Sequence, residues 1–140
     1  MKANELMIGD WVYGLYPNGK RYANPFCISA VDTYPTNRSP RIVTVGGYGF
    51  QSEHLEPIPL TAEILEKNGF EIVGREKYFL VPGDPSLAIK REPIIGAHGN
   101  SFLIGHFFEK KDFRWFIELA YIHELQHALR LCGIEKEIVI

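Results

Sequence analysis

Hydrophobic residues in positions 1–58 fall into short runs separated by turn residues, a pattern typical of antiparallel strands. The runs are Trp11–Tyr16, Phe26–Val31, Arg41–Val45 and Phe50–Leu55. Asn18-Gly19 follows the first run and favours a tight turn, since both residues tolerate a positive φ. Pro35–Pro40 and Gly46–Gly49 are further turn-forming segments. Several short strands at this spacing predict a small closed sheet, an SH3-like β-barrel.

A helix is predicted directly after the proline pair Pro57 and Pro59. Proline fixes φ and has no N–H, so this segment is expected to be extended and to form no ladder on that side. Thr61 follows and is a good N-cap. Asn68 and Gly69 should end the helix, with Gly69 in the left-handed conformation and the next residue folding back on the helix.

The second part of the chain returns to strand-like runs before a last amphipathic segment. The runs are Phe70–Val73, Tyr78–Val81, Leu87–Arg91 and Ser101–Phe107, with Gly96–Asn100 among the turn residues between them. A long helix is predicted from Asp112, as its cap, to about Cys132, and Gly133 should end it. Ile134–Ile140 alternates and predicts a closing strand.

These elements predict an α+β protein with two parts. Residues 1–58 are expected to form the small β-barrel, and residues 59–140 an α-β-β-β-α-β half of a helix, antiparallel hairpins and a long C-terminal helix. The apolar stripe of the long helix is expected to cover the C-terminal sheet with Trp115, Leu119, Ile122 and Leu129.

Composition narrows the classes of partner. The chain has 15 basic and 17 acidic residues and a formal net charge of −2. Residues 1–60 hold five basic and five acidic residues, so residues 61–140 hold ten and twelve. Neither part has the positive excess that nucleic-acid binding uses, so nucleic acid is not favoured as a partner. Cys27 and Cys132 lie in apolar runs and are expected to be small buried hydrophobes, without a disulfide framework.

The expected cellular location follows from two features, a membrane span and a signal peptide, that the sequence pattern does not show. No apolar run has the length of a membrane span, so no membrane partner is expected. The first ten residues, MKANELMIGD, hold no apolar core of a signal peptide. The cytoplasm is therefore the expected location.

One segment spells a chemical motif. His123-Glu124-Leu125-Gln126-His127 matches the zinc-protease pattern H-E-x-x-H. Histidines four apart lie one helical turn apart, so both rings can reach one zinc ion, and the glutamate can act as base on a metal-bound water. This pattern makes His123 and His127 candidate metal ligands and Glu124 a candidate catalytic base of a zinc-dependent hydrolase.

Three features favour a coincidence instead. A third protein ligand is needed, and the metzincin pattern would place it where Gly133 stands. Glu135 and Glu137 follow too closely, while His98 and His106 could contribute only if the hairpins fold back. The helix geometry also places both histidines on the flank of the apolar stripe, as half-exposed residues. We therefore expect no cofactor, and zinc only under the hydrolase alternative.

Aromatic residues are the second candidate feature, because they stack on bases or peptides in small barrels. Six of them lie in the predicted barrel, namely Trp11, Tyr13, Tyr16, Tyr22, Tyr34 and Tyr48. Alternation along a strand would turn about half of such residues into the core. The sequence is therefore consistent both with core packing and with ligand binding by these six residues.

Two segments resemble a family of small proteins of Bacteroides-type bacteria, their phages and mobile elements, a family without an assigned activity. They are Met1–Leu6 with Ile8–Val12, and Glu56–Thr61 with Glu63–Phe70. His123, Leu125-Gln126, Ala128-Leu129, Gly133 and the tail from Glu135 fit as well. In that family the position of Glu124 is often Gln and that of His127 often Asn. The resemblance thus implies that this helix serves the architecture without the H-E-x-x-H motif.

The function expected from these features is non-enzymatic. We expect an accessory or interaction protein of a phage or mobile element, with a protein as its partner, acting through the barrel surface or a groove between the two parts. The alternative is the zinc-dependent hydrolase of His123, Glu124 and His127. A third ligand near the two histidines would favour the hydrolase. Exposed aromatics in a groove, with both histidines at the surface, would favour the interaction protein.

Overall fold

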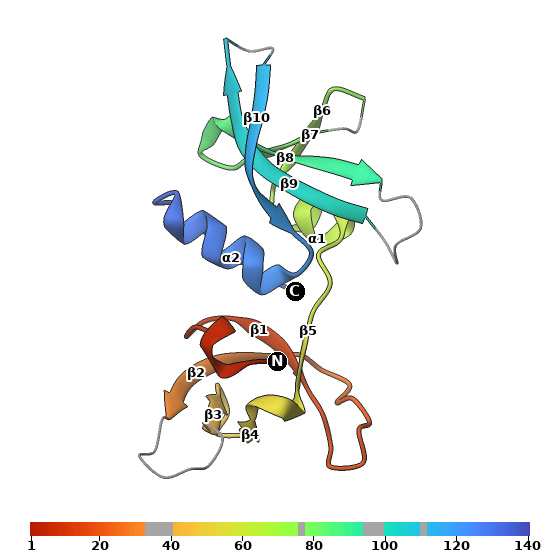
Figure 1. The fold of residues 1–140 in the computed structure, drawn as a ribbon, viewed down its shortest axis with the longest axis vertical. Coiled ribbons are helices and arrows are strands. Elements are labelled where there is room, and N and C mark those ends of the chain that lie inside the picture. Colours follow the sequence, from red (N-terminus) through yellow and green to blue (C-terminus); the bar gives the residue numbers. More distant parts are fainter. Residues whose placement is uncertain (33–40, 76–77, 94–99, 110–111) are drawn as a thin grey trace. The chain divides into compact units, whose positions relative to one another are not determined.

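A computed structural model describes residues 1–32, 41–75, 78–93, 100–109 and 112–140. The chain divides into two compact units, residues 1–58 with Ile140 and residues 59–139. Each unit has its own antiparallel sheet of five strands (Figure 1). The α+β class predicted from the sequence is confirmed at this level.

The sheet of the first unit has the strand order β4-β3-β2-β1-β5. The strands are β1 (Trp11–Gly14), β2 (Phe26–Asp32), β3 (Arg41–Thr44), β4 (Gly49–Gln51) and β5 (Leu55–Pro57). Short 3₁₀ turns lie at Ala3–Glu5 and Ser52–His54. The run Phe50–Leu55, predicted as one strand, is thus divided by a 3₁₀ turn into parts of β4 and β5. This turn lets the chain cross from one edge of the sheet to the other.

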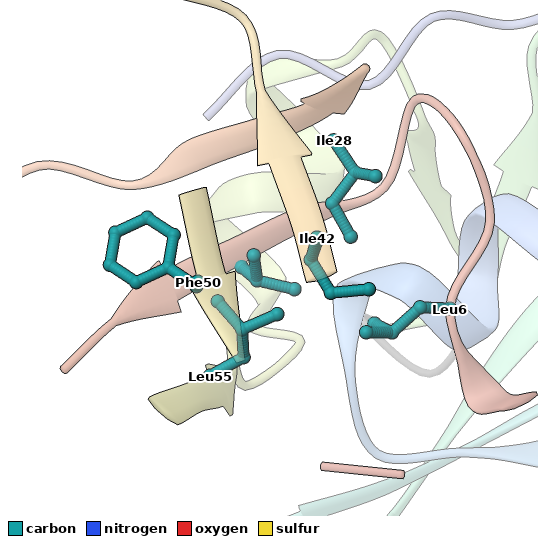
Figure 2. Packing of buried hydrophobic residues seen from close by; sticks show 6 residues of the cluster. Leu6, Ile28, Ile42, Phe50 and Leu55 are labelled. Atoms are coloured by element: carbon teal, nitrogen blue, oxygen red, sulfur yellow. The ribbon is translucent and has the colours of Figure 1, made fainter. Parts of the chain in front are cut away.

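Alternating side chains of this sheet form the core of the first unit. Its buried members are Leu6, Val12, Ile28, Ile42, Phe50 and Leu55, most of which Figure 2 labels. Val12 pairs with Phe26 on one side and with Pro57 on the other, so β1 is an interior strand of the sheet. Each fully buried aliphatic side chain contributes roughly 1.5–3 kcal/mol. Among the described residues β4 and β5 are edge strands, so the observed pairings leave the sheet open.

The second unit begins with the predicted short helix, α1 (Ala62–Lys67). Its caps agree with the sequence. The Thr61 hydroxyl accepts a hydrogen bond from the Ile64 N–H at 3.3 Å. Gly69 has a φ of +82°, and the Phe70 N–H donates to the Leu65 carbonyl, which folds the chain back as expected.

A meander of five strands follows, in the order β10-β9-β8-β7-β6. The strands are β6 (Glu71–Val73), β7 (Tyr78–Val81), β8 (Asp84–Pro93), β9 (Asn100–Phe108) and β10 (Asp112–Leu119). The predicted hairpins are therefore present, with β8 and β9 longer than expected. The turn predicted at Gly96–Asn100 and the loop at Pro35–Pro40 lie largely outside the described residues.

The long helix predicted from Asp112 is wrong in its first half. Asp112–Leu119 is β10, which pairs with β9 through a bulge between Trp115 and Ile117. The spacing of Trp115, Leu119 and Ile122 suits a helix, but Phe113, Trp115, Ile117 and Leu119 also alternate as in a strand. Pairing with β9 decides between the two periods. The second unit is thus an α-β-β-β-β-β-α arrangement.

The helical half of that segment is α2 (Ile122–Leu131). Ile122, Leu125 and Leu129 are almost completely buried, and α2 packs against β10. Leu119, Ile122 and Leu129 are buried as predicted, whereas Trp115 lies on β10 and is 57% exposed. Gly133 ends the helix as expected, with a φ of +73°.

The chain end is not the predicted closing strand. Ile134–Ile140 forms no strand, yet Ile138 is buried. The amide side chain of Asn68, at the end of α1, donates to the Val139 carbonyl at 2.8 Å and accepts from the Val139 N–H at 2.7 Å. This side chain satisfies the tail backbone in place of a neighbouring strand.

The structure also bears on the two cysteines and on the expected absence of a membrane span. Cys27 and Cys132 are free and only partly buried, so the expectation that both are buried is wrong. Within the described ranges, no helix is long and apolar enough to cross a membrane.

Candidate functional sites

The first turns of α2 hold the H-E-x-x-H segment. The rings of His123 and His127 lie 5.7 Å apart between centroids and nearly perpendicular to each other. The His123 ring also stacks on Tyr121 at 5.9 Å. The predicted flank position is wrong for His123, which is 6% exposed, and holds for His127, which is half-buried. Helix α2 starts at Ile122 rather than near Asp112, so His123 lies in its first turn.

Glu124 has a structural role at the start of α2. Its Oε2 accepts hydrogen bonds from the N–H groups of Ala120 at 2.6 Å and Tyr121 at 3.0 Å. A helix start leaves such N–H groups without intrahelical partners, and a carboxylate three residues into the helix satisfies them. These bonds hold the carboxylate at the helix N-terminus, where the macrodipole also favours its charge. The sequence signal for this role was incomplete, because the N-cap is a tyrosine rather than Ser, Thr, Asp or Asn.

A third metal ligand does not accompany the histidine pair in the described part of the chain, where no three His, Cys, Asp or Glu side chains are grouped to hold a metal ion. His106 packs its ring on Phe116 at 5.5 Å, and His98 lies outside the described residues. The structure thus brings together the two candidate ligands but places the candidate base in a helix cap. In this arrangement the Glu124 carboxylate bonds the backbone at the start of α2.

The second candidate site is a row of aromatic rings in the first unit, which we call the aromatic row (Tyr16, Tyr22, Phe26 and Tyr48). Tyr16 and Tyr22 are stacked at 3.8 Å between centroids. Tyr22 meets the edge of Phe26 at 5.4 Å, and Phe26 contacts Tyr48 at 5.3 Å. Three segments supply these residues, namely the β1–β2 connection, β2 and the β3–β4 turn.

The β1–β2 connection places the two stacked tyrosines by its local geometry. The Tyr16 N–H donates to the Lys20 carbonyl, and the Gly19 N–H donates to the Tyr16 carbonyl. Gly19 has a φ of +81°, which fits the tight turn predicted from Asn18-Gly19. The turn reverses the chain so that Tyr16 and Tyr22 come face to face.

Phe50 supports the aromatic row from the core side. Its ring contacts those of Tyr22 and Phe26 at 5.6 and 5.2 Å. A Cβ atom on Gly14 would lie 2.5 Å from the Phe50 ring, so the absence of a side chain at Gly14 makes room for this ring. The inner rings of the row therefore pack against a core side chain, Phe50.

The outer ends of the row face solvent. Tyr16 is 40% exposed and Tyr48 is 55% exposed, while Tyr22 and Phe26 between them are half-buried. Desolvation by partial burial, and then the nearby phenols of Tyr16 and Tyr48, raise the pKa of Tyr22 above its ordinary value. The Tyr22 hydroxyl is protonated at neutral pH, as tyrosine ordinarily is, and can donate a hydrogen bond.

The sequence candidates for aromatic binding are thus divided by the structure. Tyr16, Tyr22 and Tyr48 come together, Tyr13 instead lies under the Arg21 guanidinium at 4.3 Å, and Trp11 is half-buried. Tyr34 lies outside the described residues. Phe26 was missed as a member of the row, because the candidates chosen from the sequence were all tryptophan or tyrosine.

Comparisons with models of protein families, with curated proteins and with solved structures find no match to this chain.

Proposed function

We propose that the protein is a non-enzymatic interaction module that binds an extended segment of a partner protein on the aromatic row. The observation that carries this proposal is the continuous contact of four aromatic rings with both ends of the row exposed. Aromatic-lined surfaces of small β-domains bind proline-rich segments, which are already extended before binding and so lose little entropy.

The chemistry of the row suits such a segment. A polyproline II helix has no internal hydrogen bonds, so its carbonyl groups remain available as acceptors. The hydroxyls of Tyr16 and Tyr48 are close enough to that of Tyr22 to contribute to its raised pKa, and protonated phenols are hydrogen-bond donors. Stacked rings supply the apolar contact for proline side chains, and the hydroxyls supply the polar contact for the peptide carbonyls.

The SH3-like barrel remains a proposal for the first unit. It is supported by a five-stranded meander whose first strand pairs with the last, and by the 3₁₀ turn between β4 and β5. The resemblance of the sequence extends the proposal to the setting, in which the partner is a cytoplasmic protein of a phage or mobile element. The net charge of −2 favours a protein over nucleic acid as that partner.

The test is a titration of the isotope-labelled full chain with a synthetic proline-rich peptide, followed by NMR. We expect saturable shifts at Tyr16, Tyr22 and Tyr48, and none with a matched peptide in which alanine replaces proline. Tyr16→Ala and Tyr48→Ala should each weaken binding by about tenfold, the effect of losing one aromatic contact at an interface. Ile8→Ala, which also truncates an exposed apolar side chain of this unit, is the matched control. Equal binding by all variants would contradict the proposal.

The alternative function is the zinc-dependent hydrolase with His123 and His127 as ligands and Glu124 as base. One observation supports it, the 5.7 Å separation of the two rings on one side of α2. The hydrogen bonds of Glu124 with the helix start weigh against it.

A further inference from the structure

The sheet of the second unit carries aromatic side chains on the face opposite its core. Successive residues of a strand point to opposite faces. Leu87 and Ile89 are completely buried on one face of β8, and His106 pairs with Leu87 on that same face. Phe107, the next residue of β9, therefore lies on the opposite face together with its partner Phe113.

Three rings form a cluster on this second face. The Phe107 ring lies 5.0 Å from Tyr78 and 5.4 Å from Phe113, and Tyr78 lies 5.4 Å from Phe113. All three side chains are half-buried. Mutual edge contacts of this kind restrict each ring, so the cluster is a preformed aromatic wall.

A cavity of about 420 Å³, open to solvent, lies beside this wall and is lined by Val73, Pro85, Ser86 and Phe107. The size is within the roughly 300–1,000 Å³ of small-molecule sites. Val73 pairs with Tyr78, and Ser86 adjoins Leu87, so strand alternation places both on the aromatic face. Phe107 thus belongs both to the aromatic wall and to the lining of the cavity.

The lining determines the chemistry of a suitable ligand. Val73, Pro85 and Phe107 are apolar, and none of the four lining side chains is charged. The Ser86 hydroxyl donates to the Asp84 carboxylate at 2.6 Å, which leaves the lone pairs of its oxygen to accept a bond. A neutral ligand avoids the cost of desolvating a charge that none of these four described side chains can pair.

We propose that this cavity binds a neutral, planar ring compound that carries one N–H or O–H donor. The ring stacks on Phe107, whose orientation Tyr78 and Phe113 maintain, and the donor bonds the Ser86 hydroxyl oxygen. The site lies wholly within the second unit and is independent of the aromatic row and of the histidine pair.

The experiment is an NMR titration of the full chain with indole, a neutral planar ring with one N–H, and with indene, a similar bicyclic ring without it. We expect saturable shifts at Val73, Ser86 and Phe107, with indole binding about threefold to tenfold tighter than indene, the effect of one hydrogen bond. Ser86→Ala should remove that preference while leaving indene binding unchanged.

Two neighbouring substitutions provide the matched comparison. Phe107→Ala should weaken indole binding by about tenfold, since it removes the stacking ring. Phe108→Ala truncates the next side chain, which is exposed on the other face beneath Arg114, and should leave binding unchanged. Should Phe107→Ala fail to fold, Val73→Phe, which fills the cavity, serves in its place and should abolish binding. Absence of saturable shifts with wild-type chain, or equal effects of Phe107→Ala and Phe108→Ala, would overturn the proposal.

Discussion

Replacing Glu124 separates the two roles that its position suggests, because a helix cap and a catalytic base respond differently to the same change. Oε2 accepts from two backbone N–H groups at 2.6 and 3.0 Å. Losing a capping side chain costs about 0.5–2 kcal/mol, and a charge at the helix N-terminus contributes about 0.3–1 kcal/mol. Because these bonds face solvent, we expect Glu124→Ala to lower the free energy of unfolding by about 1–2 kcal/mol.

Glu124→Gln refines the expectation, since the amide oxygen still accepts but the charge is lost. Its cost should be about 0.5 kcal/mol, between wild type and Glu124→Ala. Chemical denaturation followed by circular dichroism measures these values, and hydrogen exchange of the first N–H groups of α2 localises the effect. Glu135→Ala is the control, because it removes an exposed negative charge outside any helix. If Glu124→Ala is as stable as this control, the capping argument is refuted.

Zinc analysis of the same set of proteins tests the alternative function. A zinc-dependent hydrolase would contain stoichiometric zinc that is lost in the double variant His123→Ala/His127→Ala, and Glu124→Gln would retain zinc but lose hydrolytic activity. Under the proposed interaction function, we expect no stoichiometric zinc after incubation with zinc and dialysis. Stoichiometric zinc in the wild type, absent from the double variant, would contradict that expectation.

Further predictions concern the second unit. Asn68→Ala removes three hydrogen bonds of a residue that is 5% exposed, so the free energy of unfolding should fall by about 2–3 kcal/mol. The Val139 N–H should then exchange faster with solvent, and an unchanged exchange rate would contradict this expectation. Gly105→Ala should destabilise the unit by about 1–3 kcal/mol in denaturant titrations, because its Cβ would lie 2.2 Å from a carbonyl oxygen of β10, and a wild-type midpoint would show that β10 can move aside. Burial, and then Asp84, raise the pKa of the Cys132 thiol, so less thiolate is present at a given pH. In a Cys27→Ser background, iodoacetamide should therefore react more slowly with Cys132 of the native chain than with that of the unfolded chain. Asp84→Asn should speed the reaction of the native chain. Equal rates with and without Asp84→Asn would refute the effect of Asp84 on the thiol.

Local sequence signals were sufficient to predict those features whose stabilising interactions all lie within one short segment. Thr61 and Gly69 define the two ends of α1, since a hydroxyl cap and a left-handed glycine act on their own neighbours. Asn18-Gly19 likewise forms the turn that joins β1 to β2. The α+β class also followed from the sequence, because runs bounded by turns predict antiparallel hairpins whatever their partners are.

Tertiary structure decided the conformation of a segment whose sequence pattern fits both a helix and a strand. Residues 112–119 satisfy a helical and a strand period, and only pairing with β9 selects the strand. This selection moved the start of the last helix to Ile122, which places Glu124 in the first turn, where it caps the helix. The contact of Phe26 with Tyr48 and that of Tyr78 with Phe107 join segments far apart in the sequence, so they depend on strand pairing and on which face each strand presents. Periodicity describes a segment in isolation, whereas long-range pairing determines which face of that segment reaches solvent.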